Sequence, residues 1–170
     1  MGFLDQTSTI KAMPVTVLTP GFQARCTLQV LGVVQTFLND EQRSVFPLKK
    51  VTLHGLQAGN PAVSMQLEDL YVSKGQCHAI AFETMLDQDQ SGLMPHKERM
   101  AVYTSHYVIQ GDFHLGVDNV VGDLVDSFRT FYLGATDVEF FPLFRSQAAM
   151  IQTAPLVYVY RTSVRMFHVV

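Results

Sequence analysis

Apolar and polar residues alternate along most of the chain, and the apolar positions are rich in β-branched and aromatic side chains. This period of two predicts strands that bury one face, and the spacing typical of amphipathic helices is scarce. Ten strands are predicted, in two groups of five. The first group is 15–18, 22–30, 50–53, 70–73 and 78–82, and the second is 100–103, 107–115, 137–141, 156–160 and 163–169.

A polar segment between the two groups, 83–99, is rich in Asp, Gln, Ser and Gly and is typical of a linker. The two groups also align with each other, and this self-similarity predicts duplication of a domain of about 70 residues. The matched pairs are Thr19 with Thr104 and Phe22 with Tyr107 at an offset of 85, Val34 with Val121 at 87, and Leu70 with Leu156 and Ile80 with Met166 at 86.

Each group contains one short segment with apolar residues at positions i, i+3 and i+4, the spacing of a helical turn. We therefore expect a mostly β protein with two tandem small β-barrel or sandwich domains of SH3-like or Sm-like size, each with a short helical segment. Barrel closure removes the exposed edges of outer strands. The expected organisation is an N-terminal tail at 1–12, a first β-domain at 13–83, a linker at 84–98 and a second β-domain at 99–170. The helical positions are Val34, Phe37 and Leu38, and then Val121, Leu124 and Val125.

Composition excludes several classes of protein. Hydrophobic residues make up 48% of the chain and charged residues 16%, which is too apolar for a disordered protein. The net charge of −3 and the lack of a Lys/Arg cluster argue against nucleic-acid binding. The uncharged runs are shorter than the roughly 20 residues of a membrane-spanning helix, and the N-terminus lacks a signal-peptide pattern. We expect a cytoplasmic protein in which Cys26 and Cys77 are reduced thiols.

Two stretches of the second group, YTSHYVIQGDFHL at 103–115 and DLVD with RTFYL within 123–133, resemble a small bacterial β-domain family of unknown function. That family runs from Thr through an aromatic residue, Gly, an apolar-His-apolar strand and an acidic-apolar-Asn segment to a final aromatic strand. The first group matches less closely, because Cys26 replaces the Gly and Gln29 replaces the His, and both groups lack a central Pro-Gly-Arg turn. The resemblance implies a tandem duplication of this β-domain, and it implies no activity.

Motifs for catalysis and metal binding are absent from the sequence. The six histidines form no HExxH pattern, and the chain has no CxxC pair, phosphate-binding loop or nucleophile elbow. Scattered histidines more often have a structural role than a zinc-binding one. We therefore predict no cofactor, no metal and no enzymatic activity.

Arg43 and Arg129 are the matched cations of the two groups. They are possible ligand contacts. The alternative is that each arginine caps the carbonyls of its short helix or pairs with Asp40 or Asp126.

One loop differs between the groups. The first group has His54 to Pro61, with the Gly and Asn residues of an ordinary turn, whereas the second has FFPLFR at 140–145. An exposed apolar loop marks a protein interface, although the same residues could instead pack on the first domain or the linker. The predicted interaction patch is Phe141, Pro142, Leu143 and Phe144. The apolar C-terminal strand could likewise pair with an edge strand of another chain or close its own barrel.

These features together predict a non-catalytic interaction or assembly protein that acts through apolar surface. It would be a homo-oligomer or a subunit of a larger bacterial complex. An alternative is a small-ligand or nucleotide-binding regulatory module in which Arg43 and Arg129 contact an anion. A third class is RNA binding by a small β-barrel, which the scarcity of cations near the aromatic residues disfavours.

Overall fold

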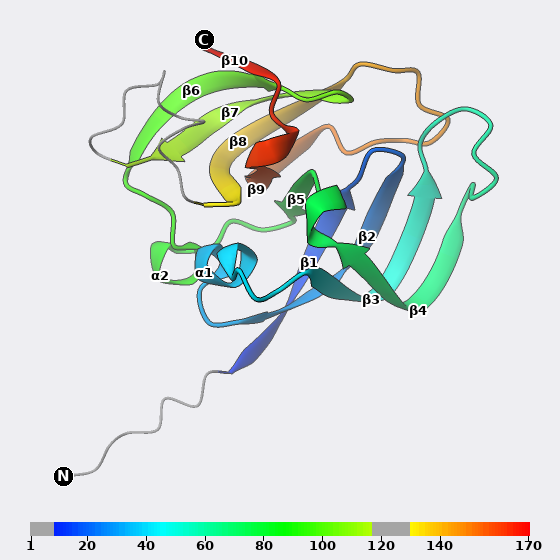
Figure 1. Cartoon of the computed structure of the whole chain (residues 1–170), viewed down its shortest axis with the longest axis horizontal. Helices are drawn as coiled ribbons and strands as arrows, with labels where there is room; N and C mark the ends of the chain where they lie inside the picture. Colours follow the sequence, from blue (N-terminus) through cyan, green and yellow to red (C-terminus); the bar gives the residue numbers. More distant parts are fainter. Residues whose placement is uncertain (1–8, 117–129) are drawn as a thin grey trace.

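The computed structural model describes residues 9–116 and 130–170, and it is mostly β (Figure 1). Ten strands form one antiparallel sheet in the order β10-β6-β7-β8-β9-β5-β1-β2-β3-β4. The strands are β1 Ile10–Leu18, β2 Phe22–Leu31, β3 Val45–Gly55, β4 Met65–Ser73, β5 Ala79–Phe82, β6 His96–Tyr103, β7 Tyr107–Leu115, β8 Tyr132–Pro142, β9 Thr153–Tyr160 and β10 Met166–Val169. The helices are α1 Val34–Asn39 and α2 Gln88–Ser91, with single 3-10 turns at Lys74–Gln76 and Arg161–Ser163.

Each predicted strand is confirmed, although several begin or end elsewhere. β1 begins at Ile10, within the predicted tail, and β6 begins at His96, within the predicted linker. The helix predicted from Val34, Phe37 and Leu38 is α1, and these three side chains are its buried face. The second predicted helix, at Val121, Leu124 and Val125, lies outside the described residues.

The sheet is continuous and does not close, whereas the sequence predicted two separate barrels or sandwiches. The reason lies at β5. This strand pairs with β1 on one side and with β9 on the other, where Phe82 lies opposite Leu156. The strand that would have closed the first barrel therefore joins it to the second group of strands. The outer strands β4 and β10 form the two ends of the sheet.

The first half of the sheet, residues 10–82, and the second half, residues 96–169, have the same strand order. It is β5-β1-β2-β3-β4 in one and β10-β6-β7-β8-β9 in the other. The pairing registers match as well. Val45 pairs with Ser73 in the first half, and the residues 87 positions further on, Tyr132 and Tyr160, pair in the second.

The structural offset between the halves differs from the sequence alignment in the later strands. Strands β1 and β6 correspond at 85 residues, as aligned, but from β3 onward the offset is 87 rather than 86. Leu70 therefore corresponds to Val157 and Ile80 to Phe167. The correction matters because a slip of one residue moves a strand side chain to the opposite face.

The two halves share a threonine hydrogen bond at one turn and a β-bulge in one strand. Thr19 Oγ1 accepts a hydrogen bond from the Phe22 amide at 3.1 Å, and Thr104 Oγ1 accepts one from the Tyr107 amide at 2.9 Å. The third strand of each half also carries a β-bulge, at which Lys50 and Asp137 both adopt a φ of 51°. Non-glycine residues seldom adopt positive φ, so two instances 87 residues apart mark the same backbone bend.

The core consists of two clusters, and each is completed by the other half. The first cluster surrounds α1 and the first half, but it also contains Tyr132, Leu156 and Tyr158 of the second half. The second cluster surrounds β7 and β8 and includes Leu18 and Ala81 of the first half. The join at β5 and β9 is consequently buried on both faces.

No helix among residues 9–116 and 130–170 is long and apolar enough to cross a membrane.

Candidate functional site

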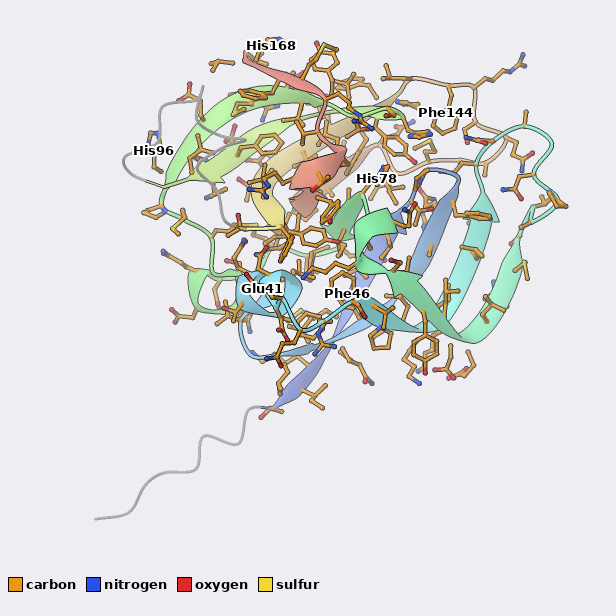
Figure 2. All side chains as sticks on the ribbon, in the orientation of Figure 1. Glu41, Phe46, His78, His96, Phe144 and His168 are labelled. Atoms are coloured by element: carbon orange, nitrogen blue, oxygen red, sulfur yellow. The ribbon has the colours of Figure 1, made fainter. Side chains whose placement is uncertain are left out.

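The apolar segment at the end of β8 is partly exposed. Phe141 and Pro142 are the last two residues of β8, paired with Val108 and Tyr107, so only the later part of the predicted loop lies outside the strand. Phe141 is 45% and Leu143 is 56% exposed, and Pro142 between them is also exposed. Phe144 differs from these three because it is half-buried and packs edge-on against Tyr107, with ring centroids 5.9 Å apart. We call Phe141, Pro142 and Leu143 the loop patch. Phe144, labelled in Figure 2, packs against the second core cluster and so anchors the loop.

Hydrogen bonds hold the rest of this loop against the first half. Ser146 forms an isolated bridge with Gln57, and the Gln147 amide donates to the Leu56 carbonyl at 2.9 Å. The buried Gln23 side chain accepts from the Ile151 amide at 2.8 Å. The alternative predicted for the loop, packing on the first domain, therefore describes residues 146–151 and not the loop patch.

A hollow of about 470 Å³ lies beside the loop patch. Its apolar walls come from the end of β8 and from the segment before β9, and its rim is polar. An exposed aromatic residue next to an apolar hollow is the arrangement found where a partner inserts a side chain. The lining residues are Glu139, Phe140, Phe141, Pro142, Ser146, Met150, Ile151, Gln152 and Thr153.

Arg43 packs beside the end of α1. Its guanidinium carbon lies 4.3 Å from the ring centroid of Phe37. The Asp40 carbonyl accepts a hydrogen bond from the Lys74 ammonium group at 2.9 Å, so the capping role that the sequence gave to Arg43 belongs to Lys74. Burial lowers the pKa of Lys74. Arg129, the other possible ligand contact, lies outside the described residues, so the pairing of the two arginines at one site stays a prediction.

Two histidines lie where the halves meet. The rings of His78 and His106 are 6.0 Å apart between centroids, and the Nδ1 atom of each is buried without a hydrogen-bond partner among the described residues. Figure 2 shows His78 near the centre of the molecule and His168 at the outer strand β10. Burial, together with the charges of His106 and Arg165, lowers the pKa of His78, which favours its neutral form.

Groups suited to nucleophilic or metal chemistry are not assembled in the described ranges. Burial raises the pKa of Cys26 to about 12, and it also raises the pKa of the fully buried Cys77. Both thiols are therefore protonated at neutral pH, whereas a reactive cysteine needs its thiolate. Within residues 9–116 and 130–170, no group of three or more His, Cys, Asp or Glu side chains could hold a metal ion.

The two end strands of the sheet also expose apolar side chains. Tyr71 on β4 is 68% exposed, and Met166 on β10 is 63% exposed. The sequence analysis identified the C-terminal strand as a possible edge but did not identify β4 as one. Tyr71 alternates with half-buried residues, which is the pattern of any strand with one buried face. Alignment of the two halves at the offset of 87 could have identified this edge. In that alignment Tyr71 corresponds to Tyr158, which is completely buried.

Comparison with known proteins gives no relative: no family model, no curated protein and no solved structure matches the chain.

Proposed function

We propose that this protein is a non-catalytic interaction or assembly protein that binds a protein partner through its apolar loop patch. The observation that carries this proposal is the exposure of Phe141, at the end of β8, and of Leu143, which begins a loop that is otherwise tied to the body of the protein. A tethered loop loses little conformational freedom on binding, so more of the burial energy is retained as affinity. The hollow beside the patch offers a matching concave surface.

The size of the patch sets the effect expected of it. Burying one Phe or Leu side chain contributes about 1.5–3 kcal/mol, and about 1.4 kcal/mol is a tenfold change in affinity. Replacing Phe141 and Leu143 together should therefore weaken binding by roughly 100-fold or more. Phe144 is unsuited to this test because its ring supports Tyr107 and the loop itself.

The experiment places a photo-crosslinking residue at Leu143 in one variant and at Met85 in another. Met85 is 54% exposed and lies away from the loop, so it is a matched control. Crosslinking in cells should give one dominant protein adduct from position 143 and none from position 85, and Phe141→Ser should abolish that adduct. Thermal unfolding of Phe141→Ser should match that of the wild type. Equal adducts from both positions, or unfolding of Phe141→Ser, would contradict the proposal.

We also infer that the two halves are tandem copies of one β-domain. The shared strand order, the shared register and the bulges at Lys50 and Asp137 support this inference. The β3–β4 loop and the β8–β9 loop differ in residue type, which suits a duplication in which one copy acquired the loop patch.

A further inference from the structure

The join between the halves is a pairing of the fifth strand of one half with the fourth strand of the other. In it, β5 and β9 run antiparallel, and Ile80 lies opposite Tyr158. The corresponding strands of the opposite halves are β10 and β4, and these are the two ends of the sheet. Each molecule therefore has a fifth strand, β10, with a free outer edge at one end of the sheet, and a fourth strand, β4, with a free outer edge at the other. Among the described residues, no backbone group pairs with the outer edge of β4 or β10.

The register of the join can be transferred to the free strands. Adding 87 to the β5 positions gives Met166 to Val169, the whole of β10, and subtracting 87 from the β9 positions gives residues 69–72 of β4. The transferred register places Phe167 opposite Tyr71 and Met166 opposite Val72. At the join, the Tyr160 amide donates to the His78 carbonyl at 2.8 Å. The corresponding residues at the free strands are Ser73 and Arg165, so the transferred register continues to this pair.

The fourth strands of the two halves, β4 and β9, differ in how far their matched side chains are buried. Tyr158 is completely buried, packs edge-on against Phe82 and donates a hydrogen bond to the Ser91 carbonyl. Its counterpart Tyr71 is the same residue type but is largely exposed. On the neighbouring strands, buried Tyr132 likewise corresponds to exposed Val45. Positions that are buried on β8 and β9 at the join are thus exposed to solvent on β3 and β4.

The fifth strands show the complementary difference. Ile80 and Phe82 are buried beneath the side chains that β9 contributes. Their counterparts on β10 are Phe167, which is half-buried, and Val169, which is exposed. The second half therefore covers β5 with its strand β9, whereas its own end strand β10 has no corresponding neighbour among the described residues.

We propose that copies of this chain associate head to tail, with β10 of one copy pairing antiparallel with β4 of the next and Phe167 opposite Tyr71. The proposal extends the proposed function by naming a second copy as a partner, and it uses a surface separate from the loop patch. Because the two surfaces differ, the contact is heterologous, and repeating it builds a closed ring or an open filament. The added strand continues the sheet through main-chain hydrogen bonds.

Two positions of the transferred pairing differ in kind. At the first, His168 stands where the join has Ala81. At the second, Asp69 stands where the join has Leu156, and its carboxylate forms an ion pair with Lys49 on β3. Charged side chains on an edge strand discourage indiscriminate pairing of edges. The contact between copies is therefore weaker than the internal join, and assembly depends on protein concentration.

The test is a register-specific disulfide between two exposed positions. In Ser73→Cys/Arg165→Cys, the new thiols lie directly opposite each other across the contact, where paired Cα atoms are about 4.5–5.5 Å apart and a disulfide can form. The native Cys26 and Cys77 are buried and do not compete. The matched control is Ser73→Cys/Met166→Cys, in which one thiol is displaced by a residue to the opposite face.

Under mild oxidation, the first variant should give a non-reducing ladder in steps of 19.0 kDa, and the control should stay at 19.0 kDa. Sedimentation of the wild type should show a mass that rises with concentration, and Tyr71→Lys should weaken this association at least about tenfold. Phe141→Ser/Leu143→Ser should still form the ladder in the Ser73→Cys/Arg165→Cys background, which separates failure of the loop patch from failure of this contact. A wild type that stays at 19.0 kDa at every concentration, equal crosslinking in both variants, or crosslinking by Ser73→Cys alone would overturn the proposal.

Discussion

The centre and the ends of the sheet are built from corresponding strands in different surroundings. At the centre, β5 and β9 are covered on both faces, and the four residues of β5 are all buried. At the ends, β10 and β4 have one strand neighbour each and expose Met166 and Tyr71. Tyr158 and Tyr71 are the same residue at matched positions, so their surroundings, which for Tyr158 include Phe82 of β5 and Ser91 of α2, determine which of them is buried.

The largest expected difference between these regions is at the matched tyrosines. Tyr158→Ala removes a buried ring and its hydrogen bond to the Ser91 carbonyl and should destabilise the protein by about 3–5 kcal/mol. Tyr71→Ala should change the stability of dilute protein by less than about 0.5 kcal/mol. Urea unfolding of both variants at low concentration measures the difference, and equal losses would show that β4 is buried in the isolated chain.

A smaller effect is expected one strand away. Tyr132 donates its hydroxyl to the carbonyls of Lys74 and Cys77, each at 3.1 Å. Tyr132→Phe should cost about 1–3 kcal/mol because the Cys77 carbonyl loses this partner, whereas the Lys74 carbonyl still accepts from the Cys77 amide. Its counterpart Val45 is exposed, so Val45→Ala should have little effect. Comparing the two unfolding midpoints tests whether β8 completes the first core, and an undamaged Tyr132→Phe protein would argue that it does not.

The half-buried histidine at the join, His78, gives a pH dependence. Unfolded His78 binds a proton near its ordinary pKa of about 6.5, whereas the folded protein binds it only at lower pH. The unfolded state therefore holds more protons in this window, and stability should fall as the pH drops below about 6.5. Chemical unfolding between pH 5 and 8 should show a flatter profile for His78→Gln, while His168→Gln, on exposed β10, should keep the wild-type slope. Identical profiles for all three proteins would refute the role given to His78.

The smallest effect on stability is expected at the charged edge position. The Lys49–Asp69 pair is exposed, so Asp69→Leu should leave the stability of dilute protein nearly unchanged. The same change restores the residue type found at the join and should strengthen association between copies. Sedimentation over a concentration series checks this, and a variant that associates less than the wild type would contradict the transferred register.

Local patterns in the sequence predict the strands and α1 well, because alternation and helical spacing depend on neighbouring residues. They do not predict which strands pair. The join of β5 and β9 connects residues far apart in the chain, and the period of two is equally compatible with a closed barrel. The run Ala79–Phe82 did contain a signal, since four consecutive apolar residues indicate a strand buried on both faces.

The four residues predicted as an interaction patch differ in exposure. Phe141 and Leu143 are exposed, whereas Phe144 packs on Tyr107 of β7, and the role of the patch as an interface stays a prediction. Composition alone cannot separate these side chains, which are all apolar. Their separation depends on hydrogen bonds from Ser146 and Gln147 to residues 55–60, which only the folded arrangement brings together.

The central claim is that the two ends of the sheet complete each other between copies. Hydrogen exchange of the backbone amides of residues 69–73 and 166–169, measured at low and high protein concentration, tests it most directly. The account predicts that protection of both segments rises together with concentration, and that Tyr71→Lys abolishes the rise in both. Exchange that is equally fast at every concentration, or protection confined to one segment, would contradict it.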